Sequence, residues 1–131
     1  MAGPRTTHRQ RRGAWAERLA ATYLEGLGWQ LVATNVHLGR DELDIVAVEP
    51  VQPAILVVVE VRGLHSPLFG SPEERVDAGK VRRLYRAAGA LRQQGALEGI
   101  QLPPAWRVDL VVVDARERGV RIRHLRALEP P

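Results

Sequence analysis

The sequence of 131 residues has no cysteine and no long apolar run. The absence of cysteine excludes disulfides, thiolate metal sites and cysteine nucleophiles, and it fits a cytoplasmic location. A membrane-spanning helix needs about eighteen or more consecutive apolar residues, and the sequence has no such run, so no membrane partner is expected. The basic start is not followed by an apolar segment, so no signal peptide is expected either.

Lysine is almost absent as well. Of the 19 basic residues, Lys80 is the single lysine and the others are arginines. This usage indicates a compositional bias that replaces lysine by arginine wherever the chemistry permits. A lysine kept against that bias favours a position that needs an ammonium group, and chance is the alternative explanation.

What the sequence does contain is typical of one globular domain. Apolar residues make up 45% and charged residues 26% of the chain. Residues 1–10 are basic without an apolar period, so we expect a flexible basic tail followed by a single domain over residues 11–128. The net charge of +4 favours a polyanionic partner, with nucleic acid the first candidate.

The apolar patterns predict seven main elements. Helices are expected where apolar residues recur every three or four positions, over residues 12–27 and 71–94. The second helix has a good start in SPEE at residues 71–74, with serine as N-cap and proline in the first turn. Strands are expected over residues 29–38, 42–48, 54–61, 106–113 and 120–125.

The order of these elements, α-β-β-β-α-β-β, predicts an α/β fold with a mixed sheet of about five strands flanked by helices. Short connections among the first three strands favour antiparallel pairing. The helix between residues 54–61 and 106–113 favours a parallel pairing of those two strands. Residues 95–104 are expected to form a loop.

Two carboxylates stand inside apolar strands, Asp44 in DELDIVAV and Glu60 in ILVVVEVR. An ionised carboxylate in such surroundings is costly unless it is paired or bound to a metal. A solvated strand end or an arginine partner explains one such residue, but two on neighbouring strands favour a shared site. Period-two alternation places Glu60 and Arg62 on one face of their strand, and Leu43 with Ile45 on the face opposite Asp44.

The four histidines show no metal-ligand spacing, and we expect them at the surface or in loops. They are His8, His37, His65 and His124.

Six motifs in order carry a resemblance to a known family. They are GAWAERLA at residues 13–20, LGWQLVATNVH at 27–37, DELDIV at 41–46, VEVR at 59–62, FGSP at 69–72 followed by Lys80, and VDLV at 108–111. With these the chain resembles the uncharacterised bacterial YraN-like family of the PD-(D/E)XK endonuclease-like superfamily across most of its length. The resemblance implies a restriction-endonuclease-like fold.

The resemblance also implies a metal site. Asp44 and Glu60 would bind one or two Mg²⁺ or Mn²⁺ ions, and Glu17 would reach in from the first helix as a supporting acid. Mg²⁺ prefers oxygen ligands and keeps several waters, and such an ion can activate water against a phosphodiester. Without the resemblance, Glu17 would be read as a surface glutamate. Glu42 is expected to be a solvated acid, or one that supports the ligands from outside, rather than a ligand.

The sequence departs from the family pattern at two positions. Arg62 stands where the family has a lysine that contacts the attacking water or the phosphate. Arginine keeps the charge but hardly deprotonates, so it could bind phosphate, or pair with the acids and replace the metal. Lys80, one helix away, is the candidate to supply the missing amine. Asp41 stands where the family has glycine, which leaves the local turn geometry open.

The first hypothesis is therefore a metal-dependent nuclease-like protein that binds or cleaves DNA or RNA. The alternative is a catalytically degenerate nucleic-acid-binding or assembly module that lacks the motif lysine. A third reading is a partner protein that forms a homodimer through its apolar second helix. For nucleic acid, the expected surface consists of Arg9, Arg11, Arg12, Arg82, Arg83 and Arg86.

Overall fold

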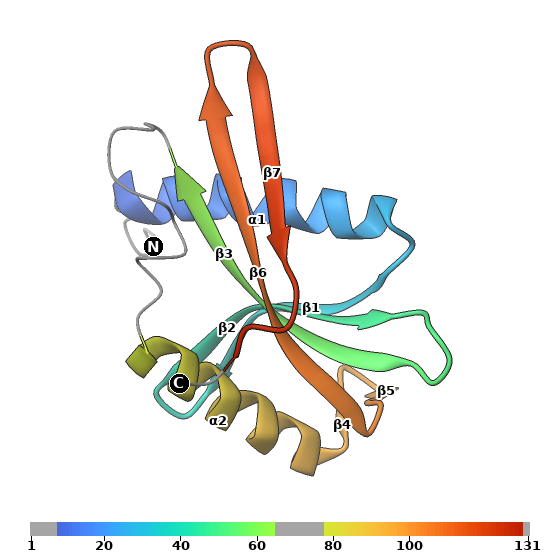
Figure 1. The fold of residues 1–131 in the computed structure, drawn as a ribbon. Coiled ribbons are helices and arrows are strands. Elements are labelled where there is room, and N and C mark those ends of the chain that lie inside the picture. The colour runs from blue at the N-terminus through green and yellow to red at the C-terminus, as the bar shows by residue number, and fades with distance from the viewer. Residues whose placement is uncertain (1–7, 65–77, 130–131) are drawn as a thin grey trace, which may run out of the picture.

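The computed structural model describes residues 8–64 and 78–129 (Figure 1). The elements are α1 (His8–Gly26), β1 (Gln30–Leu38), β2 (Asp41–Glu49), β3 (Ile55–Leu64), α2 (Ala78–Gln94), β4 (Ala96–Leu97), β5 (Ile100–Gln101), β6 (Ala105–Arg116) and β7 (Gly119–Leu125). The predicted order is confirmed. The two short strands β4 and β5 pair with each other inside the segment that was expected to be a loop.

Two predicted boundaries bear on the ends of the helices. Helix α1 begins at His8, so the last three residues of the expected basic tail, residues 8–10, are helical. The predicted start of the second helix at residues 71–74 lies outside the described residues, and the described part of α2 begins at Ala78.

The five long strands form one mixed sheet in the order β1-β2-β3-β6-β7. Strands β1, β2 and β3 pair antiparallel, as the short connections predicted. Strand β6 pairs parallel with β3, with Glu60 opposite Leu110, and antiparallel with β7. The predicted parallel pair is therefore confirmed, and it places β3 and β6 in the centre of the sheet.

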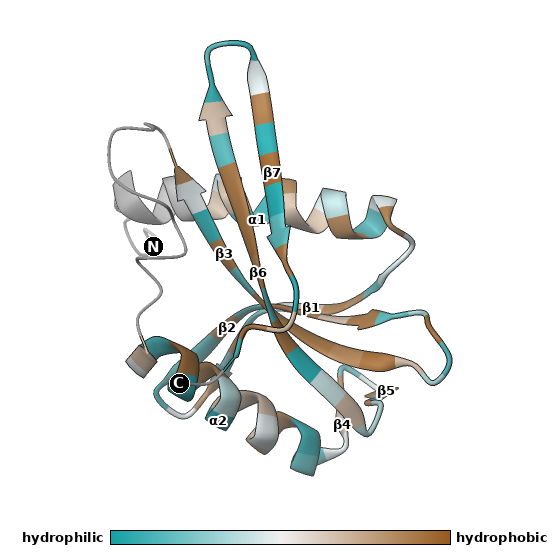
Figure 2. Cartoon of the chain, viewed as in Figure 1, coloured by the Kyte–Doolittle hydropathy of each residue, from teal (hydrophilic) through white to brown (hydrophobic). Residues whose placement is uncertain are grey.

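Each face of the sheet is covered by one helix (Figure 1), and Figure 2 shows the apolar colour along the central strands. Helix α1 packs its buried residues Ala16, Ala20 and Leu24 on one face. Helix α2 packs Leu84 and Leu91 on the other. Strand β3 contributes to both clusters, which explains its unbroken apolar run. Each valine or leucine buried in this way contributes about 1.5–3 kcal/mol.

The regular alternation expected in β2 is wrong at one point. Leu43 packs beneath α2 together with Val46, whereas Ile45 packs beneath α1. The alternation breaks at Asp44, between Leu43 and Ile45. Opposite this break lies Asn35 of β1, whose φ of +52° is a left-handed conformation that asparagine tolerates better than most residues.

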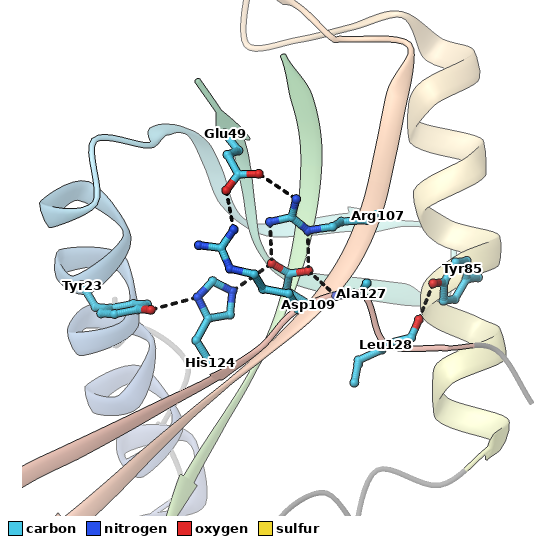
Figure 3. A network of polar contacts seen from close by, with 9 residues as sticks. Tyr23, Glu49, Tyr85, Arg107, Asp109, His124, Ala127 and Leu128 are labelled. Carbon is cyan, nitrogen blue, oxygen red and sulfur yellow. Dashed lines mark hydrogen bonds and ion pairs between the residues drawn. The ribbon is translucent and has the colours of Figure 1, made fainter. Parts of the chain in front are cut away.

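Asp109 of β6, which is level with Val59 of β3, is the centre of a buried polar network (Figure 3). Arg107 donates to both of its carboxylate oxygens, from Nε at 2.8 Å and from Nη2 at 3.1 Å. The backbone N–H of Ala127 donates to Oδ1 at 2.9 Å. Burial alone would raise the pKa of Asp109, but the hydrogen bonds from His124 and Arg107 hold it below its ordinary value.

The same network corrects the expectation that His124 lies at the surface. Its side chain is 6% exposed, with Nε2 at 2.8 Å from Asp109 Oδ2 and Nδ1 at 2.9 Å from the Tyr23 hydroxyl. Glu49 pairs with both Arg107 and Arg126, and the hydrogen bond from Arg107 is the largest cause that holds the pKa of Glu49 below its ordinary value. The network ties β2, β6, α1 and the segment after β7 together.

Candidate metal and phosphate site

The candidate site lies where β2 and β3 separate. Their ladder ends at the pair of Ile45 and Val59, while β3 continues alongside β6 as far as Leu64. Beyond that pair, a side chain replaces the backbone as hydrogen-bond acceptor. The backbone N–H of Val61 donates to Asp44 Oδ2 at 2.8 Å. The separation places the Asp44 carboxylate beside β3, next to Glu60.

Glu60 is buried on the face of β3 that carries α2, with a side chain only 5% exposed. Its Oε1 lies 3.4 Å from Nη2 of Arg62 and 3.7 Å from Nζ of Lys80. Its Oε2 is buried and has no hydrogen-bond partner. A buried carboxylate oxygen without a partner is unusual, and it is the kind of atom that a bound cation satisfies.

Glu17 of α1 lies close to Asp44 and Asn35, and both shift its pKa. Burial, then the negative charge of Asp44, raises the pKa of Glu17 from 4.5 to about 7, against a hydrogen bond from Asn35 that lowers it. Glu17 also shares a hydrogen bond with Asp44. The structure thus brings Glu17, Asp44 and Glu60 together from three different elements.

Burial raises the pKa of all three acids, and the charge of Asp44 adds to the rise at Glu17 and Glu60, whereas a hydrogen bond with Glu60 lowers the pKa of Asp44. Burial, then the charge of Asp44, raises the pKa of Glu60 from 4.5 to about 7. Burial is also the largest cause that raises the pKa of Asp44 above its ordinary value. The exposed Glu42 adds to this field, because its charge raises the pKa of both Glu17 and Asp44. A cation would relieve this repulsion.

These shifts predict how the stability of the metal-free protein depends on pH. Between about pH 4.5 and pH 7 the folded protein holds protons on Glu17 and Glu60 that the unfolded chain has released, so the free energy of unfolding falls as the pH rises. We expect the same trend in the thermal midpoint, measured with a chelator present. The midpoint of Glu60→Gln should fall less between about pH 4.5 and pH 7 than that of the wild type. The exposed Glu25→Gln on α1 serves as control. If the thermal midpoints of the wild type and of Glu60→Gln change equally with pH over this range, the prediction is wrong.

The residues present fit a divalent ion with few protein ligands. Among residues 8–64 and 78–129, no group of three or more Asp, Glu or His side chains is arranged to hold a metal. Mg²⁺ usually keeps several waters and takes one or two carboxylates from a protein. Asp44 and Glu60 supply hard carboxylate oxygens, and one of these, Glu60 Oε2, lacks any other partner. The pair therefore suits such an ion.

Arg62 lies beside the acids, on the face predicted from the alternation of β3. Its guanidinium is half-buried and is in contact with Glu60, and its Nε is buried without a hydrogen-bond partner. The planar guanidinium has a fixed fork of donors, so this unused N–H suits a phosphate oxygen. The same contact with Glu60 is also what a replacement of the metal by Arg62 would require.

Lys80 connects the acids to a cleft between the start of β2 and α2. The cleft has a volume of about 340 Å³ and is lined by Arg40, Asp41, Glu42, Leu43, Lys80, Arg83, Leu84, Arg86 and Ala87. Lys80 therefore faces this cleft and lies 3.7 Å from Glu60. The walls carry Arg40, Lys80, Arg83 and Arg86 against Asp41 and Glu42, and this excess of positive charge suits an extended polyanion.

The predicted nucleic-acid surface is placed in part. Arg83 and Arg86 line the cleft, and Arg82 is exposed on the same helix. The side chains of Arg9, Arg11 and Arg12 lie outside what the structure describes. Asp41, the departure from the family glycine, forms a pair with Arg86 at 3.2 Å. The turn before it remains tight, because Gly39 adopts a φ of +61°.

Sequence reasoning missed two features of the site. Asn35 received no role, although the motif ATNVH contains it, because nothing in a strand pattern shows that one residue turns left-handed. The charge of Glu42 was underrated, since its effect on the acids depends on the irregular end of β2.

A five-stranded mixed sheet with one helix on each face, and acids where β2 and β3 separate, defines a PD-(D/E)XK-like fold. Residues 16–113 match the uncharacterised protein family UPF0102, and the chain belongs to this family, the YraN-like family of that superfamily.

Relatives in several bacteria support the assignment. A UPF0102 protein of Arthrobacter sp. (strain FB24) is 38% identical over 117 residues, which are 88% of this chain and 93% of that protein. One of Herpetosiphon aurantiacus is 33% identical over 118 residues, or 88% of this chain and 91% of that protein.

The solved structure of Pyrococcus furiosus SfsA in complex with Ca²⁺ is similar at a TM-score of 0.36 and 14% identity, over 98% of this chain and 75% of that chain.

None of the helices in the described residues is long and apolar enough to cross a membrane.

Proposed function

We propose that this protein is a metal-dependent nuclease-like protein that binds DNA or RNA in the cleft between β2 and α2 and cleaves it at Asp44 and Glu60. The observation that carries the proposal is Glu60 Oε2, a buried carboxylate oxygen without a partner beside a second buried acid. A cytoplasmic location is part of the proposal, because it fits both a nucleic-acid partner and the absence of cysteine.

In this proposal each residue has a separate task. Asp44 and Glu60 would hold Mg²⁺ or Mn²⁺, which when bound polarises a phosphodiester and activates water. Glu17 positions Asp44 through their shared hydrogen bond. Arg62 and Arg83 bind phosphate oxygens, and Lys80, in reach of Glu60, donates a hydrogen bond to the reacting phosphate or its leaving oxygen.

Calorimetric titration with Mn²⁺ tests the metal site. We expect the wild-type protein to bind Mn²⁺ and Asp44→Asn to lose that binding, because the amide keeps the shape but not the charge of the ligand. Asp41→Asn, in the same cleft but paired with Arg86, should bind Mn²⁺ like the wild type. Equal binding by the wild type and Asp44→Asn would contradict the proposal.

The contact between Arg62 and Glu60 favours a second candidate, a degenerate module in which Arg62 takes the place of the metal. In that case Arg62→Ala should create or strengthen Mn²⁺ binding, and the wild type should bind oligonucleotides without cleaving them. A homodimer through α2 has less support, because its apolar residues Val81, Leu84 and Leu91 are buried within the same chain.

A further inference from the structure

The hairpin of β6 and β7 extends beyond the end of β3 as a narrow two-stranded ribbon (Figure 1). The last residue of β3, Leu64, is opposite Asp114 of β6, and β6 continues to Arg116. Arg116 pairs with Gly119, so the strands are joined by a two-residue turn. Gly119 adopts a φ of +93°, and such short turns hold the two strands in fixed register.

The tip of this ribbon is exposed and carries three arginines against one glutamate, Glu117, which is in the turn. Arg116, Arg118 and Arg121 are all exposed, and the turn has the polar colour in Figure 2. Arg116 pairs with Asp114 at 2.9 Å, but Arg118 and Arg121 have no ion-pair partner among the described residues. Val120 is the one large apolar side chain that the tip exposes, at 46%. A phosphate backbone suits such a surface better than a lipid layer, which would need more apolar contact.

The ribbon lies on the same side of the sheet as the acids. Glu60 of β3 is level with Leu110 of β6, and Arg121 of β7 is opposite Asp114 of β6. Since side chains alternate along β6, Leu110, Asp114 and their partners Glu60 and Arg121 share one face. The turn follows Leu110 by seven residues (117 − 110), so it lies about 23 Å along the strand from Glu60 at about 3.3 Å per residue.

We propose that the β6–β7 ribbon is a second contact for double-stranded nucleic acid held at the acid site, an inference that rests on the proposed function. A separation of about 23 Å corresponds to about seven base-pair steps of a duplex at about 3.4 Å each. A duplex is stiff enough to meet both surfaces at once, and a two-stranded ribbon has the width that a major groove admits. A single strand has no such fixed spacing.

Fluorescence anisotropy tests the inference with a labelled duplex of about 20 base pairs, a single strand of equal length, and a salt titration in Ca²⁺. We expect the wild type to prefer the duplex. Arg118→Ala combined with Arg121→Ala should reduce the log–log salt slope for the duplex by about two, since each phosphate contact contributes about 0.9. Arg92→Ala, which removes an arginine bonded to the Pro104 carbonyl near the end of α2, serves as control.

Mn²⁺ titration of the double variant shows in parallel whether its acid site is intact. If that variant binds Mn²⁺ and also binds the duplex with the affinity and slope of the wild type, the inference is wrong and the proposed function stands. A wild type that prefers the single strand, or that binds anionic phosphatidylserine vesicles and not the duplex, also overturns the inference. If the wild type does not bind Mn²⁺, the proposed function fails and the inference fails with it.

Discussion

Replacement of Lys80 by arginine should lower the rate of metal-dependent cleavage by about 100-fold or more. Lys80 is the single lysine of the chain, and its Nζ lies 3.7 Å from Glu60 Oε1 on the wall of the cleft. Arginine keeps the positive charge, but its planar guanidinium hardly deprotonates, whereas an ammonium can exchange a proton. A positioned proton donor or acceptor typically contributes about 10²–10⁴-fold to a rate.

The measurement is cleavage of a labelled oligonucleotide in Mn²⁺ under single-turnover conditions. Arg92→Lys, on the same helix but outside the cleft lining, is the matched control and should change the rate little. Equal cleavage by wild type and Lys80→Arg would show that the amine is not needed.

If the wild type is inert, Arg62→Lys provides the complementary test. This change restores the family lysine at the position in contact with Glu60. Recovery of cleavage would assign the loss of activity to Arg62 and would show that Lys80 does not replace the motif lysine. Two inert proteins that both bind oligonucleotides would favour the degenerate module.

Asp109→Ala should destabilise the folded protein by about 3 kcal/mol or more. The side chain of Asp109 is fully buried, and its two oxygens accept from Arg107 and Ala127 and lie against His124. Its removal takes from Arg107 and His124 the carboxylate that both contact, although Arg107 keeps Glu49 and His124 keeps Tyr23. Loss of one member of a buried ionic network typically costs about 3–5 kcal/mol. At the usual dependence on urea, this loss moves the unfolding midpoint by about 1–3 M.

Asp114→Ala is a matched control on the same strand. Asp114 is also buried, but it pairs with the half-exposed Arg116, and its Oδ1 has no hydrogen-bond partner. Removal of this carboxylate should therefore shift the midpoint much less. An Asp109→Ala protein that unfolds at the wild-type midpoint would show that the network adds nothing to stability. If Asp109→Ala does not fold at all, Asp109→Asn is the alternative variant. The amide keeps the shape and one acceptor, so this protein should fold, with a midpoint below that of the wild type.

The sequence by itself determined the order of the elements, because hydrophobic periodicity and strand length report directly on local structure. It also identified Asp44 and Glu60, since a carboxylate inside an apolar strand is conspicuous without any coordinates. The parallel pairing of β3 and β6 followed from the helix between them, because a crossover of that length permits little else. The resemblance then supplied Glu17 and Lys80 as site residues.

Only the tertiary structure decided how these residues meet. The separation of β2 from β3 before Ile45 lies opposite a left-handed Asn35 in β1, which no period of two or 3.6 reveals. The role of Asp109 was equally hidden. Arg107 is its neighbour on the same strand, but His124 and Ala127 come from β7 and the segment after it, which only the folded sheet brings alongside. The pKa of about 7 at Glu60 likewise arises from burial and from the charge of a neighbouring strand, and both exist only once the chain has folded.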